Sequence, residues 1–200
     1  MLIILDRDGV INQFDGGYIC STDEWQPIPG SIEAIAELSK AGHLVAVATN
    51  QSGIGRGYYD HKTLNAMHKR LRHLVGQLDG RIELIAYCPH HPDEGCSCRK
   101  PETGLLDAIR TGLNMSDDSP AVMVGDSLKD LQAGEAAHCD LVLVRTGNGE
   151  ETEVQLLDSE LADKVTIVDN LATFAREFLM QNPIGNHHEY LFDSEPGKQQ

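Results

Sequence analysis

The segment Leu2-Ile3-Ile4-Leu5-Asp6-Arg7-Asp8-Gly9-Val10, residues 2–10, joins an apolar run to two aspartates at positions i and i+2. Consecutive apolar residues of this kind are typical of a strand buried on both faces of a parallel sheet. Ligands of open α/β sheets bind outside the carboxyl ends of the strands, so Asp6 and Asp8 are predicted to face such a site. The pair alone is weak evidence, because paired acids also occur at solvated loop ends.

The rest of the chain alternates strand-like and helix-like segments, which is the pattern of βαβ units. Further strands are predicted at 44–48, 82–87, 121–124, 141–145 and 165–168, and helices at 31–41, 60–78, 103–113, 127–137 and 170–180. The segment 147–163 is acidic and is predicted to form turns. The fold class is therefore α/β, with a Rossmann-like, doubly wound and mainly parallel sheet flanked by helices.

Composition limits the classes of function. The chain has 200 residues, 40% of them hydrophobic, which suits a single domain expected at 1–180 followed by a flexible tail at 181–200. Its formal net charge of -15 argues against nucleic-acid binding, which depends on Lys and Arg. The start has no basic segment and its apolar run is short, so no signal peptide or membrane span is predicted. A cytoplasmic monomer is expected.

Three more polar segments are predicted to gather at the same edge of the sheet. They are Thr49-Asn50-Gln51-Ser52-Gly53, Arg99-Lys100-Pro101 and Gly125-Asp126-Ser127-Leu128-Lys129-Asp130. Each segment alone is ordinary, but acids, a hydroxyl, a cation and further acids in this order suit phosphoryl transfer, which needs positioning and charge neutralisation. Asp130 is either a partner of Asp126 or Lys100, or a surface acid.

A cluster of metal-binding residue types lies in the loop 87–100. Three thiols and an imidazole are supplied by Cys88, His90, Cys96 and Cys98, the ligand set of a closed structural zinc site. His91 is an alternative ligand to His90, and free thiols in a disordered loop are the alternative to zinc. A four-ligand Zn²⁺ leaves no position for water, so it is expected to shape the loop that carries Arg99 and Lys100.

The four motifs resemble those of the haloacid dehalogenase-like (HAD-like) phosphatase superfamily. The resemblance implies that Asp6 is the nucleophile and Asp8 the general acid and base, while Thr49 and Lys100 bind the transferring phosphoryl group. It also implies Mg²⁺ bound by Asp6, the backbone carbonyl of Asp8, and Asp126. Val10 departs from the threonine of many relatives. The interval between Asp8 and Thr49 is too short for a large cap domain.

The zinc loop and its flanking motifs narrow the resemblance. Together with the segments 6–9 and 98–101 it is similar, over residues 1–180, to the group of D-glycero-D-manno-heptose-1,7-bisphosphate 7-phosphatases and histidinol-phosphate phosphatases. The loops 15–18 and 49–57 favour the heptose enzymes, which implies removal of the C7 phosphate in synthesis of nucleotide-activated heptose for the lipopolysaccharide core. The implied substrate-binding residues are Asp15, Gly16, Gly17, Tyr18, Asn50, Gln51, Ser52, Arg99 and Ser127, with Arg99 on the distal C1 phosphate.

Three other functions remain as alternatives. A histidinol-phosphate phosphatase would share the motifs and differ in substrate. A receiver-like phospho-acceptor would also use a strand-end aspartate and a lysine, but its acceptor follows a middle strand, whereas Asp6 follows the first, and it would lack an acid such as Asp8. A binding module built on the zinc loop would leave the four motifs unexplained.

Overall fold

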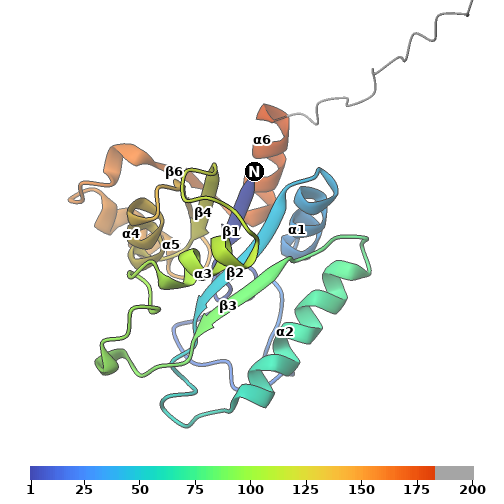
Figure 1. Ribbon diagram of the computed structural model, residues 1–200, viewed down its shortest axis with the longest axis vertical. Helices are drawn as coiled ribbons and strands as arrows, with labels where there is room; N and C mark the ends of the chain where they lie inside the picture. Colours follow the sequence, from blue (N-terminus) through green and yellow to red (C-terminus); the bar gives the residue numbers. More distant parts are fainter. Residues whose placement is uncertain (183–200) are drawn as a thin grey trace, which may run out of the picture.

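The sheet at the centre of the molecule is parallel. The computed structural model describes residues 1–182, and the predicted tail at 181–200 lies outside them from residue 183 on. Six strands form one sheet in the order β3-β2-β1-β4-β5-β6 (Figure 1). Their bounds are Leu2–Leu5 (β1), Leu44–Asn50 (β2), Leu84–Cys88 (β3), Ala121–Gly125 (β4), Asp140–Val144 (β5) and Val165–Val168 (β6).

Strand β1 occupies the middle of the sheet, with Leu5 in register with Val47 of β2 and Val124 of β4. The chain builds outward from β1 to β2 and β3, then returns to begin β4 on the other side of β1. Such a reversal of strand order is a topological switch point, and ligands bind in the crevice at its carboxyl end. The predicted doubly wound α/β fold is thus confirmed, and β1 delivers the first acidic motif to that crevice.

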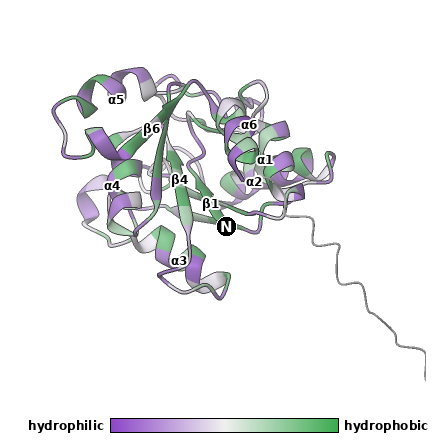
Figure 2. Ribbon diagram, turned by 90° about the horizontal axis from the view of Figure 1, so that it is seen from above, coloured by the Kyte–Doolittle hydropathy of each residue, from purple (hydrophilic) through white to green (hydrophobic). Residues whose placement is uncertain are grey.

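Helices cover both faces of the sheet (Figure 2). One face carries α1 (Ser31–Lys40), α2 (His61–Gly76) and α6 (Leu171–Gln181), and the other carries α3 (Gly104–Gly112), α4 (Leu128–Ala136) and α5 (Gly149–Leu156). Alternate residues of β1 point to opposite faces, as the period of a strand requires. Ile3 and Leu5 join the first core, whereas Leu2 and Ile4 join the second.

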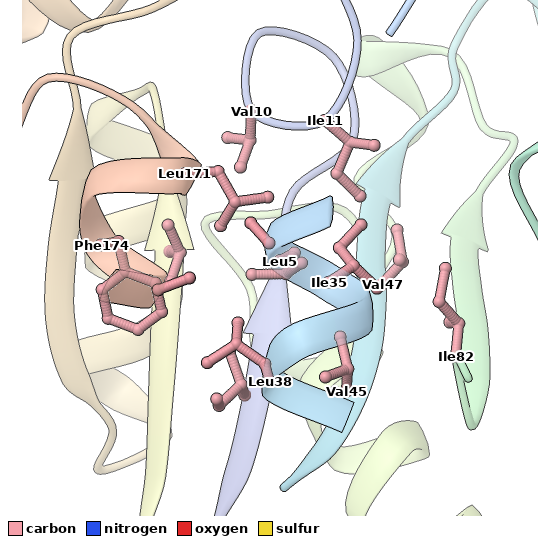
Figure 3. Close-up of a cluster of buried hydrophobic side chains, with 14 of the residues drawn as sticks. Leu5, Val10, Ile11, Ile35, Leu38, Val45, Val47, Ile82, Leu171 and Phe174 are labelled. Carbon is pink, nitrogen blue, oxygen red and sulfur yellow. The ribbon is translucent and has the colours of Figure 1, made fainter. Parts of the chain in front are cut away.

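The first core fixes β1 in place. Figure 3 shows Ile35 and Leu38 of α1 beside Leu5 of β1, with Phe174 of α6 in the same cluster. All of these side chains are at most 5% exposed. A leucine or isoleucine buried in this way contributes about 2–5 kcal/mol when judged by truncation to alanine. The strand that precedes Asp6 is therefore anchored by the packing of its side chains.

Most predicted helices and strands differ from the structure by one or two residues at an end, and one predicted segment differs in type. Strand β2 continues to Asn50 and β3 is shifted to Leu84–Cys88, because both strands pair to their ends. The prediction of turns at 147–163 was wrong, since this segment contains α5 and a short 3-10 helix, Ala162–Lys164. Only Leu156 of α5 is a buried large apolar residue, so the segment lacks the periodicity that identifies an amphipathic helix. Its first turn carries Glu150 and Glu151, which favour a helix N-terminus.

Candidate active site

Asp6 directly follows β1, and its backbone N–H donates to the Val124 carbonyl at 2.9 Å. Its side chain enters a cavity of about 430 Å³ at the switch point, a size typical of small-molecule sites. The cavity has no covering domain among residues 1–182, and no helix in that range is long and apolar enough to cross a membrane. The cavity is lined by residues of all four predicted motifs, including Asp6, Asp8, Thr49, Lys100 and Asp126.

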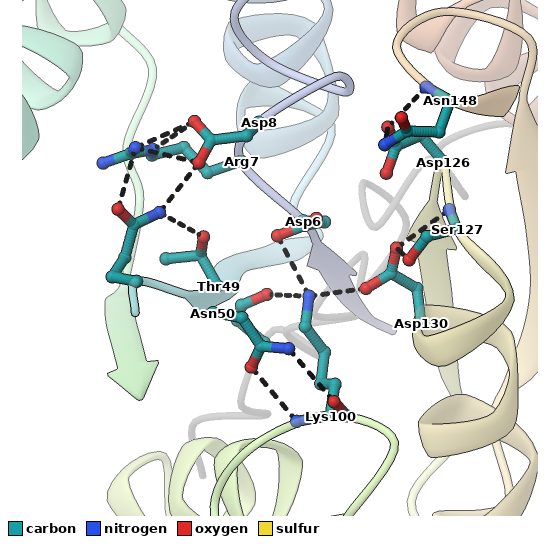
Figure 4. Close-up of polar contacts among 12 residues, drawn as sticks. Asp6, Arg7, Asp8, Thr49, Asn50, Lys100, Asp126, Ser127, Asp130 and Asn148 are labelled. Carbon is teal, nitrogen blue, oxygen red and sulfur yellow. Dashed lines mark hydrogen bonds and ion pairs between the residues drawn. The ribbon is translucent and has the colours of Figure 1, made fainter. Parts of the chain in front are cut away.

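The ammonium group of Lys100 lies between two carboxylates. Its Nζ is 2.9 Å from Asp6 Oδ1 and 2.6 Å from Asp130 Oδ1, and it donates to the Ala48 carbonyl at 2.6 Å (Figure 4). Burial opposes a charge on Lys100, but the attraction of Asp130 and Asp6 outweighs it and raises the lysine pKa. Asp130 is 1% exposed and also accepts from Ser127 Oγ. Of the two interpretations of Asp130, the structure supports the partner of Lys100 and not the surface acid.

Three carboxylates surround one point beside this lysine. Oxygen atoms of Asp6, Asp126 and Asp130 lie within 4.8 Å of one another. Burial and mutual repulsion raise the pKa of Asp6 to about 7 and that of Asp126 to about 8. Asp6 Oδ1 is buried, and apart from its ion pair with Lys100 it has no polar partner among residues 1–182. Hard oxygen donors in this state fit a divalent cation such as Mg²⁺.

The backbone closes tightly around Asp126. Asn148 donates to Asp126 Oδ2 from its backbone N–H at 2.8 Å and from Nδ2 at 3.0 Å. Gly9 has φ +83°, and a Cβ there would lie 2.1 Å from Asp126 Oδ2, while one on Gly147 would lie 2.2 Å away. The loops after β1 and β5 thus both approach the carboxylate of Asp126, which directly follows β4, and only glycine fits at these two positions.

The carboxylate of Asp8 turns away from Asp6 and toward Arg7 (Figure 4). Arg7 donates from Nε at 3.0 Å and from Nη2 at 2.8 and 3.0 Å, and Gln51 Nε2 donates at 2.9 Å. Burial raises the Asp8 pKa, but the charge of Arg7 and the hydrogen bonds outweigh it and lower the pKa. Asp8 is thus ionised at neutral pH, with its side chain 19% exposed at the cavity.

The side chains after β2 serve two purposes. Gln51 Nε2 also donates to Thr49 Oγ1 at 2.8 Å, so the Thr49 hydroxyl proton is free for another acceptor. Asn50 forms two hydrogen bonds of 3.1 Å with the backbone of Lys100. Gln51 Oε1 accepts from Tyr59 at 2.6 Å and from Arg7 at 3.1 Å, so the Gln51 amide is fully engaged within the protein. Asn50 and Gln51 border the cavity, but their amides hold other site residues.

A second chain of contacts leads from Asp8 into the core. Asn12 Nδ2 donates to Asp8 Oδ1 at 3.0 Å, and Asn12 Oδ1 accepts from the indole N–H of Trp25 at 2.8 Å. Both Asn12 and Trp25 are fully buried. Arg70 lies over the Trp25 ring, with its Cζ 5.7 Å from the ring centroid.

The cavity wall contains most of the predicted substrate-binding residues. Gly16, Gly17, Tyr18, Ser52, Arg99 and Ser127 line it, whereas Asp15 does not and instead faces the Gly17 N–H. The Nη1 atom of Arg99 is buried without a hydrogen bond to any described residue. Tyr18 packs edge-on against Tyr58 at 4.9 Å between centroids, with Arg56 over its ring. The two loops that carry these residues therefore meet at the rim.

The four predicted zinc ligands gather at one point. Cys88 Sγ is 3.5 Å from Cys96 Sγ and from His90 Nδ1, and His90 Nδ1 is 3.2 Å from Cys98 Sγ. A tetrahedral Zn²⁺ with bonds of about 2.0–2.3 Å separates its ligands by roughly 3.5–3.8 Å, and the observed separations of 3.2–3.5 Å need only a small outward shift of the side chains to fit zinc. His91 instead accepts from the Asp93 N–H and begins the 3-10 helix Pro92–Glu94. The structure therefore brings His90, not His91, to the cluster.

Several site residues escaped the sequence reasoning. These are Arg7 and Asn12, which hold Asp8, together with Asn148 and Thr152, which bind Asp126. Arg7 and Asn12 lie close to Asp6 and Asp8 in the sequence, and this closeness was the signal that could have identified them as site residues. Asn148 and Thr152 belong to the region of α5, whose helix was not predicted, and only the three-dimensional contacts identify them.

Known proteins match both the sequence and this geometry. A HAD-hydrolase-like family model matches residues 97–174. The D-glycero-beta-D-manno-heptose-1,7-bisphosphate 7-phosphatase of Pseudomonas aeruginosa is 54% identical, covering 89% of this chain and 97% of that protein. The Pseudomonas putida protein of the same name is 53% identical, covering 89% and 99%. The crystal structure of D,D-heptose 1.7-bisphosphate phosphatase from B. bronchiseptica, complexed with magnesium and phosphate, gives a TM-score of 0.84 at 44% identity, covering 90% and 98%.

Proposed function

Because this chain belongs to the D-glycero-beta-D-manno-heptose-1,7-bisphosphate 7-phosphatases of the HAD-like hydrolases, we propose that it removes the C7 phosphate of that bisphosphate through an aspartyl-phosphate on Asp6. The observation that carries this proposal is the arrangement of Asp6, Lys100 and Asp126 at the switch point, beside Asp8 and Thr49. Hydrolysis of a phosphoric monoester needs a nucleophile, charge neutralisation and an acid, and these residues provide all three.

In the first step, a carboxylate oxygen of Asp6 attacks phosphorus and the bond from phosphorus to the sugar oxygen breaks. Asp8 gives the leaving oxygen a proton. Since Asp8 is ionised before substrate binds, it takes up that proton in the substrate complex, and a phosphate monoanion can supply it because the second phosphate pKa is about 6. Thr49 donates a hydrogen bond from its free hydroxyl to the phosphoryl group in transfer, and Lys100 neutralises negative charge on that group.

In the second step, water attacks the phosphorus of the aspartyl-phosphate and Asp8 accepts a proton from that water. The bond between Asp6 and phosphorus breaks, which restores the Asp6 carboxylate, and the proton held by Asp8 passes to the departing inorganic phosphate, so Asp8 is ionised again. Asp8 suits the role of base because Arg7 and Gln51 keep it ionised at neutral pH.

Two metal ions complete the proposal. Asp6, the Asp8 backbone carbonyl and Asp126 would hold Mg²⁺, which supplies charge that reduces repulsion between the nucleophile and the phosphate. The raised pKa values of Asp6 and Asp126 support a cation at this position. Cys88, His90, Cys96 and Cys98 would hold Zn²⁺, which fixes the loop and leaves no position for substrate.

The substrate is a free sugar phosphate. The net charge of -15 argues against nucleic-acid binding, and an anionic substrate needs a local cation. Arg99 supplies one at the cavity wall, and its Nη1, which has no hydrogen bond to any residue in the range 1–182, suits a phosphate distal to the reacting one. All five cysteines are free, which agrees with a reducing compartment such as the cytoplasm. The protein would act there as a monomer.

The test is release of inorganic phosphate from heptose 1,7-bisphosphate, heptose 7-phosphate and histidinol phosphate, in Mg²⁺ and after its removal. The bisphosphate should have the highest kcat/KM, and Asp6→Asn should be inactive on all three although it is folded. The relatives reported above favour the heptose substrate over histidinol phosphate. Appreciable turnover by a pure Asp6→Asn protein would exclude the aspartyl-phosphate, and a preference for histidinol phosphate would exclude the proposed substrate.

A further inference from the structure

The guanidinium group of Arg7 is buried directly behind the site. It is 0% exposed, and Asp8 is the only carboxylate within salt-bridge distance of it among residues 1–182. Its remaining polar neighbours are neutral: Gln51 Oε1 accepts from Nη2 at 3.1 Å, and His68 Nε2 lies 3.5 Å from Nη1. Burial and the charge of Arg7 lower the His68 pKa to about 3, so His68 adds no charge. The buried charge of Arg7 is thus balanced by Asp8 alone.

Both oxygens of Asp8 are already satisfied by protein donors. Oδ1 accepts from Arg7 and from Asn12, and Oδ2 accepts from Arg7 and from Gln51. To reach a leaving oxygen or a water, the carboxylate must therefore exchange one of these partners. Hydrogen bonds to charged donors are roughly twice as strong as neutral ones, so the amides of Gln51 and Asn12 are released before Arg7.

Resting on the proposed phosphatase function, we propose that Arg7 is a positioning residue, a buried pivot that holds the carboxylate of Asp8 while it exchanges a neutral amide donor for the reacting oxygen. Complete departure of Asp8 would leave Arg7 as an unpaired buried charge, which is strongly unfavourable. The pivot therefore confines Asp8 to a short range of positions at the cavity. It acts on both chemical steps, because the same carboxylate serves the leaving oxygen and then the water.

The arrangement is specific to arginine. A lysine would keep the charge but present one ammonium group in place of the Nε and Nη2 donors that contact both oxygens. In Arg7→Lys, Asp8 would remain ionised yet lose its fixed orientation. Misplacement of a catalytic group by about 1 Å can reduce a rate by the order of 10²-fold. Substrate binding would change little, since Arg7 does not line the cavity.

A double-mutant cycle between Arg7→Lys and Asp8→Asn tests the proposal. We expect Arg7→Lys to lower kcat by about 10²-fold, with KM close to wild type. In the Asp8→Asn background the same change should lower kcat less than about threefold, because the group that Arg7 positions is gone. Arg110→Lys is the matched control, since Arg110 is 2% exposed and donates to backbone carbonyls of Ser116, Ser119 and Ala137. It should lower the Tm and leave kcat unchanged.

A second readout separates acid catalysis from general damage. An aryl phosphate has a leaving group that needs little protonation, so Arg7→Lys should slow formation of the phosphoenzyme less with 4-nitrophenyl phosphate than with the sugar phosphate. Equal loss of kcat with and without Asp8, or wild-type kcat in Arg7→Lys, would overturn the proposal. If Arg7→Lys is unfolded at the assay temperature, Arg7→Gln takes its place in the cycle. Activity of wild type and inactivity of Asp6→Asn, measured in parallel, separate failure of the pivot from failure of the phosphatase function.

Discussion

Replacement of Arg99 by alanine should separate the two phosphates of the substrate. In the free protein, Nη1 of Arg99 is buried with no hydrogen bond to any residue in the range 1–182, so its desolvation is uncompensated. A distal phosphate at the cavity wall would supply the missing acceptor. Hydrogen bonds to charged groups contribute about 1.5–3 kcal/mol, and 1.36 kcal/mol corresponds to tenfold in rate. Arg99→Ala should therefore lower kcat/KM for heptose 1,7-bisphosphate by about 10- to 150-fold.

The assay is phosphate release from heptose 1,7-bisphosphate and heptose 7-phosphate, by wild type and Arg99→Ala. The monophosphate has no C1 phosphate, so its kcat/KM should change less than about threefold. Arg81→Ala is the control for net charge, because Arg81 is exposed, pairs with Glu83 and lies outside this cavity. Equal losses for both substrates would refute the reasoning and assign Arg99 to the reacting phosphate or to the loop.

Loss of the Arg99 guanidinium should have the opposite effect on the stability of the free protein. An unsatisfied buried donor costs about 1–3 kcal/mol, and in a protein of this size 1 kcal/mol changes the Tm by about 2–4 °C. Arg99→Met removes the donor and keeps apolar volume, so the Tm of the free protein should not fall and should rise by a few degrees. A clear fall in Tm would mean that Arg99 supports the fold of the zinc loop.

Three further perturbations address the metal sites and the lysine. Lys100→Met leaves Asp6 and Asp130 buried without their cation, so we expect no turnover. The free energy of unfolding, measured with urea, should fall by about 3–5 kcal/mol at pH 8 and by less at pH 5, where the carboxylates can take up protons. Equal decreases at the two pH values would contradict this prediction. The pKa of Asp6 is raised to about 7 and that of Asp126 to about 8, from an ordinary 3.8, so the folded protein binds protons that the unfolded chain releases. Without Mg²⁺, the stability contributed by these two groups should therefore fall as pH rises from about 4 to 8, whereas the stabilisation by added Mg²⁺ should grow over that interval. Thermal unfolding with and without Mg²⁺ should show both trends, and an effect of Mg²⁺ that does not depend on pH would mean that the ion binds at another site. Elemental analysis should find one zinc per chain in the wild type and none in Cys96→Ser. Chelation of zinc should increase amide hydrogen exchange in residues 88–98 before it weakens Mg²⁺ binding. Zinc-free protein whose loop stays fully protected from exchange would exclude the zinc site.

Much of the fold was predictable because its signals are local. The buried strand before Asp6 and the alternation of segments identify a parallel sheet, and the switch point then places the four motifs together. The close spacing of Cys88, His90, Cys96 and Cys98 likewise defines the zinc site without long-range information. The placement of the four motifs requires only that strands end where polar residues begin.

The remaining features depend on contacts between distant segments. Nothing in the sequence distinguishes Arg7 from an arginine on the surface. Only the fold shows that it is buried against Asp8 and Gln51. Asn148 reaches Asp126 because Gly9 and Gly147 allow two loops to approach, which no periodicity reveals. Helix α5 has little apolar periodicity, since it is buried mainly through Gly149, Thr152 and Leu156.

Trp25 gives this protein a built-in optical probe. It is the single tryptophan of the chain, and its indole N–H is bonded to Asn12, which is bonded in turn to Asp8. An indole without access to solvent emits at short wavelength, and its emission responds to nearby charge and hydrogen bonding. If Asp8 exchanges its Asn12 partner during turnover, the emission of Trp25 should change on the same timescale. Stopped-flow fluorescence of the unlabelled enzyme could then follow the exchange of partners by the Asp8 carboxylate during turnover.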